Sequence, residues 1–406
     1  MKCRHCRTNL NHVFLDLGHA PPSNSYLKKL KQEENFYPLK LYVCHCCGLV
    51  QTVDYAERNE FFNEDYAYFS SISESFLNHA KTYSEMIINR LDLNKDSFVV
   101  EIASNDGYLL KNFVGSKIPC LGIEPTKSTA QSARLLNIPV KEDFFDSNLA
   151  STIARSEKKA DLILGNNVYA HVPDINDFTK GLKLLLNKKG TINLEFPHLM
   201  QLLMFNQFDT VYHEHYSYLS LRTVIKIFEK TGLDIYDVDE LEIHGGSLRV
   251  YGCHKEENRE ISKNVKKVIN LEKKLGMEKL KIYKDFQKKS EMIKDTLNSF
   301  LVKQKKENKL VCAYGAAAKG STLLNYAGID DNLIKYVFDA APSKQNKFLP
   351  GSHIPILHPN EIKKIKPDVL IILPWNIKDE IITQNSYVKK WGCEFVTFIP
   401  KLEIIK

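Results

Sequence analysis

Short runs of apolar residues alternate with amphipathic stretches through the middle of the chain. Apolar runs of about four to eight residues predict buried strands, and helix-like spacing between them predicts helices. Such alternation is typical of a mainly parallel sheet that helices cover on both faces. We expect strands at 97–102, 118–124, 135–140, 160–165 and 190–196, with one intervening helix at 178–187.

The pattern changes after residue 220 and then repeats. A helix is expected at 221–231, followed by two strands at 233–241 and 247–253. Residues 254–309 are rich in Lys and Glu and contain no Pro, which predicts one or two long connecting helices. A second alternation follows and predicts a second Rossmann-like sheet, with strands at 310–314, 334–339, 369–373 and 394–398 and a helix at 320–326.

The first 50 residues differ from the rest, because short cysteine pairs flank a polar, Pro-containing stretch with little helical periodicity. We expect a loop-rich module there that needs a metal ion to fold, followed by one or two helices between 65 and 93. The predicted domains are a zinc-binding module at 1–64, a sheet domain at 65–254, a helical connector at 255–308 and a second sheet domain at 309–406.

Composition narrows the class of protein. With 406 residues, 43% of them hydrophobic and 26% charged, the chain is globular and large enough for two or three cores. Its net charge of +7 is concentrated in 254–309 beside many Glu residues, which indicates a solvated helix face rather than a nucleic-acid groove. Without a membrane-length apolar run or a signal peptide, we expect a soluble cytoplasmic protein, as a monomer or small homo-oligomer.

The strongest local motif is a pair of CxxC sequences, Cys3 with Cys6 and Cys44 with Cys47. Two such pairs complete the tetrahedron that Zn²⁺ prefers. Four sulfur ligands indicate a structural site, because a catalytic zinc keeps one position open for water. The loop between the pairs is long, so Cys46 or His45 is an alternative ligand.

Small and polar residues follow the strand at 97–102, and an acidic residue ends the next strand. Small residues let a cofactor approach the backbone, and the Glu124 carboxylate can accept hydrogen bonds from ribose hydroxyls. The loop lacks the GxGxxG glycines that a dinucleotide pyrophosphate needs, which favours S-adenosylmethionine over NAD. A structural turn is the alternative. The candidate cofactor-binding residues are Glu101, Ala103, Asn105, Asp106, Gly107, Glu124 and Pro125.

Two further polar clusters follow later strands. Asn166, Asn167 and His171 come after the strand at 160–165, at the carboxyl end of the sheet, which faces the ligand crevice. They are candidates for contacting cofactor or substrate, and Asn166 and Asn167 are assigned to the cofactor. Residues 212–216 read Tyr-His-Glu-His-Tyr, and their two histidines are too close in sequence to share a helical face as in HExxH metalloproteases. Histidine titrates near neutral pH and tyrosine can donate to an oxyanion, so this run favours acid–base chemistry. For any one of these residues, a buried structural role is the alternative.

Taken in order, these motifs resemble those of the zinc-containing sugar C-methyltransferases, which act on nucleotide-linked 4-keto-6-deoxyhexoses. The resemblance rests on the CxxC pairs and on 66–71, 101–107, 166–173, 212–216, 244–249 and 315–321. It implies an α/β protein with an N-terminal zinc-binding module, a central class I methyltransferase (Rossmann-like) domain and a C-terminal second Rossmann-like domain. The strands at 233–241 and 247–253 resemble the antiparallel hairpin that ends a methyltransferase sheet.

The resemblance also implies roles for individual residues. His215 would be the base that removes the C3 proton, Tyr212 and His171 would contact or stabilise the enolate, and Glu214 would orient its neighbours. Tyr68 would close over the sugar, and inversion at C3 would follow. The further candidate substrate contacts are Ser70, His244 and Arg249.

The turn at 315–321 is expected to receive the diphosphate of the substrate. Its Gly and Ala residues permit close backbone approach, a helix N-terminus attracts anions, and Lys319 adds a positive charge. A turn that serves only as scaffold is the alternative. The candidate residues are Gly315, Ala316, Lys319 and Ser321.

These expectations describe a methyltransferase that uses S-adenosyl-L-methionine and structural Zn²⁺ to make a branched-chain sugar in deoxysugar biosynthesis. Its partner is a nucleotide-linked keto-sugar, with neither nucleic acid nor membrane. One alternative is an O- or N-methyltransferase with another small acceptor. Another is a non-catalytic, zinc-stapled nucleotide-sugar-binding protein. The nucleotide base, the sugar and the oligomeric state are left open by the sequence.

Overall fold

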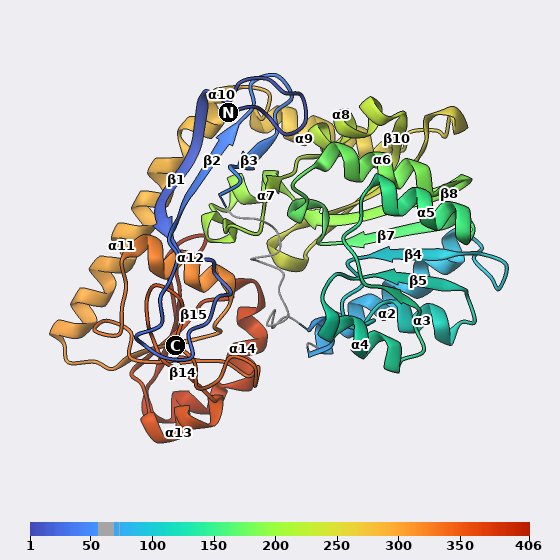
Figure 1. The fold of residues 1–406 in the computed structure, drawn as a ribbon. Helices are drawn as coiled ribbons and strands as arrows, with labels where there is room; N and C mark the ends of the chain where they lie inside the picture. The colour runs from blue at the N-terminus through green and yellow to red at the C-terminus, as the bar shows by residue number, and fades with distance from the viewer. Residues whose placement is uncertain (56–68, 73) are drawn as a thin grey trace.

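The computed structural model describes residues 1–55, 69–72 and 74–406, and its strands form three sheets (Figure 1). The N-terminal sheet contains β1 (His12–Ala20), β2 (Tyr37–Val43), β3 (Val50–Thr52) and β9 (Ser217–Tyr218). The central sheet contains β4 (Val99–Ile102), β5 (Cys120–Ile123), β6 (Val140–Lys141), β7 (Ala160–Asn166), β8 (Leu186–Pro197), β10 (Leu233–Leu241) and β11 (Ser247–His254). The C-terminal sheet contains β12 (Val311–Tyr314), β13 (Val337–Phe338), β14 (Ile356–Leu357), β15 (Val369–Ile372), β16 (Glu394–Thr397) and β17 (Glu403–Ile405).

The helices follow the same division along the chain. Those of the central part are α2 (Glu74–Arg90), α3 (Leu110–Gly115), α4 (Lys127–Leu135), α5 (Ser147–Ser156), α6 (Ile175–Leu185), α7 (Leu199–Met204) and α8 (Leu221–Thr231). The connector contains α9 (Lys263–Leu275), α10 (Leu280–Lys284) and α11 (Phe286–Lys306). The C-terminal part contains α12 (Ala318–Ala327), α13 (Ile362–Ile365) and α14 (Lys378–Gln384).

The central sheet has the order β10-β11-β8-β7-β4-β5-β6. Strands β8, β7, β4, β5 and β6 are parallel, and the hairpin of β10 and β11 is antiparallel, as the sequence predicts. Neighbouring residues of β4 face opposite sides, so Val100 packs with α5, α6 and α8 while Val99 packs with α2, α3 and α4. Helices therefore cover both faces of the sheet, and a ligand can approach it at the carboxyl ends of the strands.

The C-terminal sheet has the order β14-β13-β12-β15-β16-β17, parallel except for its last strand. Two doubly wound sheets and an N-terminal cysteine module confirm the predicted fold class. The switch between β13 and β15 on either side of β12 places the segment before α12 at a ligand-binding edge.

The N-terminal sheet joins the other parts of the molecule. Strand β9, which follows the 212–216 run, pairs with β3, so a strand from the central part completes this sheet. On its other side, β1 runs beside α11, seen in Figure 1 as a blue strand next to a gold helix. The ring of Phe14 in β1 stacks on that of Phe286 in α11, with ring centroids 4.9 Å apart. The domain boundaries stay predictions, and shared cores cross them.

Several predicted elements need correction. The first 50 residues are not mainly loop, because β1 and β2 pair over most of their length, with bulges that hide the alternation of β1. The expected strand at 135–140 is wrong: Leu135 ends α4 and is 85% exposed, and Asn137 turns the chain with a positive φ. Strands β14 and β17 were not predicted, since each has only two or three residues. Within the described parts of the chain, no helix is long and apolar enough to cross a membrane.

Candidate active site and metal centre

A cavity of about 430 Å³ lies where the three parts of the chain meet. Asn24 and Tyr26 come from the N-terminal part, and Lys319, Lys344 and Asn376 come from the C-terminal part. The central sheet supplies most of the remaining wall through the segments after its strands, which include Ala103, Asn105, Glu124, Pro125, Asn166, Asn167, His171, Tyr212, Glu214, His215 and His244. Most of the residues predicted from the sequence therefore share one cavity.

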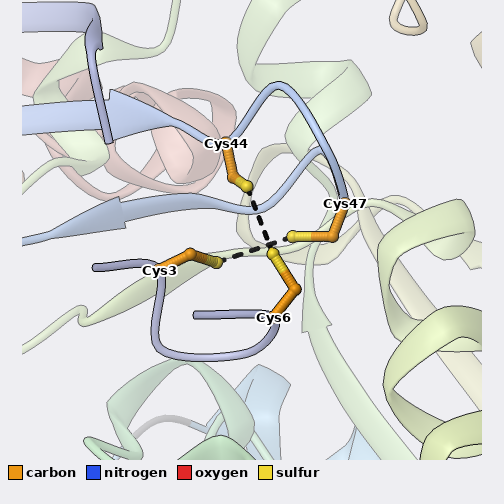
Figure 2. A group of neighbouring side chains, drawn as sticks. All are labelled: Cys3, Cys6, Cys44 and Cys47. Atoms are coloured by element: carbon orange, nitrogen blue, oxygen red, sulfur yellow. Dashed lines mark hydrogen bonds between the residues drawn. The ribbon is translucent and has the colours of Figure 1, made fainter. Parts of the chain in front are cut away.

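The four predicted cysteines form one cluster, with all their sulfur atoms within 4.8 Å of one another (Figure 2). The Sγ atoms of Cys3 and Cys47 lie 3.6 Å apart, and those of Cys6 and Cys44 lie 3.4 Å apart. A tetrahedral zinc with Zn–S bonds of about 2.3 Å needs sulfur atoms roughly 3.8 Å apart, so the cluster fits Zn²⁺. The alternatives, His45 and Cys46, are both exposed and outside the cluster.

The turn after β4 has an unusual backbone. Ala103 and Asn105 both have positive φ, a conformation that non-glycine residues rarely adopt and that is concentrated at functional sites. Gly107 has φ of +78°, and a Cβ there would lie 2.5 Å from Ile138 Cδ1. The side chain of Asn105 accepts the Ser70 N–H at 2.9 Å, so predicted residue Ser70 sits beside this turn and lines the cavity.

The Glu124 carboxylate at the end of β5 fixes this turn. It accepts the N–H of Asn105 and the N–H of Thr126, each at 2.9 Å, while still lining the cavity. Burial raises the pKa of Glu124. A carboxylate can accept more than two hydrogen bonds, so Glu124 keeps capacity for ribose hydroxyls.

Behind the lining lies a second buried carboxylate. Glu101 is 1% exposed, and neither of its oxygens has a hydrogen-bond partner within the described parts of the chain. Burial, followed by repulsion from Glu124 and Asp106, raises its pKa well above the ordinary value. Buried acceptors without donors fit a ligand that brings positive charge, as the sulfonium and ammonium groups of S-adenosylmethionine do. Asp106, which accepts the Ser71 N–H at 3.1 Å, and Gly107 lie outside the lining itself.

The segment after β6 was not predicted to contact a ligand. Asp143, Phe144 and Phe145 line the cavity at the carboxyl end of that strand, next to the region of Glu124. Aromatic rings beside a carboxylate suit a purine with an exocyclic amine. The rule that places ligand contacts at the ends of parallel strands would have found these residues, but β6 was predicted at the wrong position.

Three rings gather among the cavity-lining residues that follow β7 and β8. The imidazoles of His171 and His215 lie 4.6 Å apart at an interplanar angle of 71°, and the ring of Tyr212 lies 4.0 Å from that of His215. His171 Nδ1 donates to the backbone oxygen of Glu214 at 2.8 Å, which leaves Nε2 as the acceptor of the neutral ring. Burial lowers the pKa of His171 to about 4 and that of His215 well below its ordinary value. Both rings are therefore neutral at pH 7.

Glu214 connects this cluster to the N-terminal part. Its Oε1 accepts a hydrogen bond from Asn24 at 3.1 Å, the side chain is 2% exposed, and burial raises its pKa. The neighbouring His213 points elsewhere, because its Nε2 donates to the backbone oxygen of Tyr37 at 3.3 Å. Of the two histidines in the run, only His215 lines the cavity.

Positive charge comes from the C-terminal wall. Lys319 donates to Asn376 Oδ1 at 2.9 Å and lies over the Trp375 ring, and enclosure lowers its pKa to about 8. Lys344, which the sequence analysis missed, lines the same wall at 3.4 Å from Asp339. Lys344 had no motif to mark it, because 22 residues (322–343) separate it from the glycine- and alanine-rich turn that ends at Ser321.

Three residues of the 315–321 turn, Gly315, Ala316 and Ser321, do not line the cavity. Gly315 packs so closely on Pro374 that a Cβ would lie 2.4 Å from its Cδ. The N–H of Ala316 donates to Asp339 at 2.8 Å, and Ser321 donates to the backbone oxygen of Ser23 at 3.2 Å. Their polar groups are engaged within the protein, so the expected phosphate contacts of Gly315, Ala316 and Ser321 are not supported by their positions.

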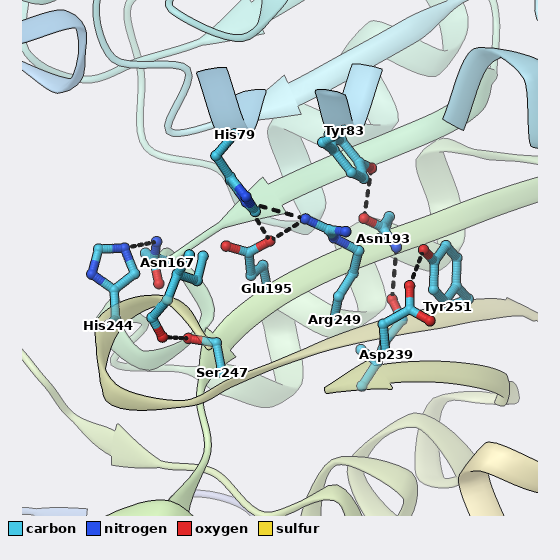
Figure 3. A network of polar contacts seen from close by, with 12 residues as sticks. His79, Tyr83, Asn167, Asn193, Glu195, Asp239, His244, Ser247, Arg249 and Tyr251 are labelled. Atoms are coloured by element: carbon cyan, nitrogen blue, oxygen red, sulfur yellow. Dashed lines mark hydrogen bonds and ion pairs between the residues drawn. The ribbon is translucent and has the colours of Figure 1, made fainter. Parts of the chain in front are cut away.

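Arg249 also lies away from the cavity, in the buried network of Figure 3. It donates to Glu195 Oε2 at 2.7 Å and contacts His79 Nε2 at 3.2 Å, so a structural ion pair replaces the expected substrate contact. His244 does line the cavity, within 3.4 Å of Asn167 Nδ2. Tyr68 falls outside the described residues.

Comparison with known proteins places this geometry in a family. The chain is 31% identical over 372 residues to the C-methyltransferase NovU of Streptomyces niveus, an alignment that covers 92% of this chain and 88% of that one. The chain belongs to the C-methyltransferase family. Within it, residues 242–400 match the model "C-methyltransferase C-terminal domain", residues 76–238 match "Methyltransferase domain" and residues 3–62 match "Putative zinc binding domain".

Two solved methyltransferases resemble part of this C-methyltransferase. An S-adenosylmethionine-dependent methyltransferase from Anabaena variabilis covers 45% of this chain and 93% of its own, at 17% identity and a TM-score of 0.34. Magnesium protoporphyrin IX methyltransferase from Synechocystis covers 44% and 83%, at 12% identity and a TM-score of 0.36. The family, rather than these scores, establishes an S-adenosylmethionine-dependent C-methyltransferase with a zinc-binding module.

Proposed function

We propose that this C-methyltransferase deprotonates C3 of a nucleotide-linked 4-keto-6-deoxyhexose and methylates that carbon to give a branched-chain sugar. The observation that carries the proposal is the cluster of His215, His171 and Tyr212 in a cavity that Glu124, Lys319 and Lys344 also line. Carbon becomes nucleophilic only when a neighbouring ketone acidifies its C–H bond, so C-methylation needs a base beside an enolate donor. S-Adenosylmethionine, when bound, supplies an electrophilic methyl group.

His215 is the base in this proposal. It is 7% exposed, and burial, followed by repulsion from His171 and Lys319, holds its pKa well below the ordinary value, so its ring has a free electron pair at pH 7. A neutral imidazole has one protonated and one unprotonated nitrogen, and the unprotonated nitrogen is the acceptor for the substrate proton. Tyr212 beside it is the donor to the enolate oxygen.

His171 has a narrower role than the sequence implies. Because its Nδ1 donates to Glu214, the neutral ring can only accept at Nε2 and does not donate to an oxyanion. We assign it to orient His215 or to accept a substrate hydroxyl. Glu214, held by Asn24, orients the segment between them.

The cationic end of the cavity suits the diphosphate of the substrate. Lys319 and Lys344 line the same wall, and both ammonium groups are partly shielded from solvent. Two cations near one cavity wall match two linked phosphates better than a neutral acceptor. Glu124, together with Asn105 and Asn166 of the same cavity, would hold the cofactor.

The direct test uses the purified holoprotein, S-adenosylmethionine and a panel of TDP-, GDP- and CDP-linked 4-keto-6-deoxyhexoses. Mass spectrometry should show a gain of one methyl group with one class of nucleotide, and NMR should place the methyl group on C3. A methyl group on oxygen or nitrogen would contradict the proposal, as would binding of the sugar without any transfer.

A further inference from the structure

Arg4 lies between two of the zinc-site cysteines and yet contacts two segments of the active site. It is 8% exposed, so its guanidinium is enclosed by protein. Its backbone N–H donates to Gln51 Oε1 at 2.9 Å, and Gln51 Nε2 in turn donates to the sulfur of Cys3 at 3.2 Å. The first cysteine loop is thus bonded to strand β3 on the inside of the module.

The guanidinium of Arg4 reaches the segment that follows His171. Its Nη1 donates to the backbone oxygen of Pro173 at 2.6 Å, two residues beyond that histidine. His5 supports the same segment, since its Nδ1 lies 2.8 Å from Asn176 Oδ1 and Asn176 Nδ2 donates to the backbone oxygens of Arg4 and His5. The loop between Cys3 and Cys6 therefore holds residues 173–176.

The same guanidinium reaches the segment that carries His215. Its Nη2 donates to the backbone oxygen of Thr52 at 3.0 Å. Thr52 donates through its N–H to the oxygen of Tyr216 at 3.1 Å and through Oγ1 to the oxygen of His215 at 3.4 Å. Arg4 also lies over the Tyr216 ring, with Cζ 5.3 Å from its centroid. One side chain is therefore bonded directly to the segment after His171 and, through Thr52, to the segment that carries His215.

We infer that Arg4 is a positioning residue, which sets the separation of His171 and His215 and couples that separation to the zinc cluster. The planar guanidinium suits this role because it donates in two fixed directions, whereas an ammonium is a point charge without that geometry. The inference rests on the proposed function only in taking His215 as the base; the structural coupling stands without it.

The experiment compares Arg4→Lys with Arg7→Lys, a matched control on the same loop whose side chain is exposed. Each holoprotein is labelled with ¹³C-histidine, the His171 and His215 imidazole signals are assigned from single substitutions of each, and zinc content is measured in every sample. Arg4→Lys should retain zinc and shift both signals, while Arg7→Lys leaves them in place. With an accepted sugar, kcat should fall about ten- to a hundredfold, and the dissociation constant of S-adenosylmethionine should not change.

Unshifted imidazole signals in zinc-loaded Arg4→Lys overturn the inference, even if the enzyme methylates a sugar. If Arg4→Lys loses zinc or unfolds, Asp54→Asn decides. The Asp54 carboxylate accepts from Arg4 Nη2 at 2.8 Å and is largely exposed, so its loss frees the guanidinium without touching the cluster. Asp54→Asn should shift the same two signals by a smaller amount, and unshifted signals there overturn the inference. Failure of the proposed function would give a different result. The wild-type protein would then transfer no methyl group, although substitution of Arg4 still shifts the imidazole signals of His171 and His215.

Discussion

The imidazole rings of His171 and His215 lie 4.6 Å apart at 71°, although one follows β7 and the other follows β8. Both rings are neutral at pH 7, because burial lowers the pKa of each. The parallel pairing of β7 and β8 brings the two segments to the same sheet edge. This juxtaposition is the basis for assigning proton abstraction to the C-methyltransferase.

Replacing His215 with Gln should lower kcat for methyl transfer about a hundred- to ten-thousandfold, the usual contribution of a general base. Binding of S-adenosylmethionine, measured by calorimetry, should be unchanged, because the cofactor end of the cavity is lined by other residues. His213→Gln is the matched control, since His213 contacts the Tyr37 backbone rather than the cavity. Equal losses in the two variants would contradict the assignment of His215.

The pH dependence of kcat/KM should lack a transition near pH 6.5, the ordinary pKa of histidine. Because burial depresses the pKa of His215, the neutral base is already fully present at pH 6.5 and is lost only when the pH falls well below it. A series of kcat/KM measurements between pH 5.5 and 8, at constant ionic strength, checks this prediction. A loss of activity centred at pH 6.5 that disappears in a His215 variant would contradict it.

The lowered pKa of His171 predicts how the stability of the protein depends on pH. His171 has a folded pKa of about 4 and an unfolded value near 6.5, so the unfolded chain binds more protons below pH 6.5. Its contribution to stability is complete above pH 6.5 and is lost as the pH falls towards 4. In urea denaturation, the free energy of unfolding of wild type should therefore drop more steeply between pH 6.5 and 4.5 than that of His171→Gln; parallel curves would contradict the shift.

Substitution of Cys44 should release bound zinc, whereas substitution of its neighbour Cys46 should not. Cys44→Ser removes a buried ligand of the cluster, so bound zinc should fall well below one ion per chain and the melting temperature should drop. Cys46→Ser changes an exposed residue outside the cluster and should keep the metal. Metal analysis and calorimetry measure both outcomes. Normal zinc content in Cys44→Ser would rule out this ligand set.

Affinity for S-adenosylmethionine should rise with pH. Glu101 is buried with a raised pKa, and a bound cation favours its charged form, so binding releases a proton. The dissociation constant should fall by at most about tenfold per pH unit until Glu101 ionises in the free protein. Calorimetric titrations should show that Glu101→Gln removes this slope. A slope unchanged by the substitution would assign the proton to another group.

Nucleoside diphosphates should bind less tightly as the pH rises through about 8, where Lys319 loses its proton in the free protein. Lys319→Met should weaken UDP, GDP or TDP binding by about ten- to a hundredfold at pH 7, the usual worth of a charged hydrogen bond. Lys335→Met, at an exposed position, is the control. Unchanged nucleotide affinity in Lys319→Met would argue for a scaffold role of the turn.

Much of the fold and the cavity could be predicted from local patterns. Apolar runs located β4, β5, β7 and β8, and the rule that ligands meet the carboxyl ends of parallel strands brought Glu124, Asn166 and His215 together. Where the pattern was short or broken it failed: Leu135 is apolar but exposed, so apolarity alone predicted a strand in place of a helix end.

Contacts between distant segments could not be predicted in this way. Lys344 carries no motif, and only the C-terminal topology brings it to the wall that Lys319 also lines. Arg249 lies in a motif, but its charge is satisfied by Glu195 across two strands. Arg4 reads as a spacer between two cysteines until its hydrogen bonds to Pro173 and Thr52 are seen.

The most direct test of the central claim is solvent exchange at C3. Wild-type protein, S-adenosylhomocysteine in place of the methyl donor, and an accepted 4-keto-6-deoxyhexose nucleotide are incubated in D₂O, and the C3 position is followed by NMR. The account predicts that deuterium enters C3 with wild type and not with His215→Gln. Methyl transfer by the wild type without any exchange at C3, or undiminished exchange by His215→Gln, would contradict it.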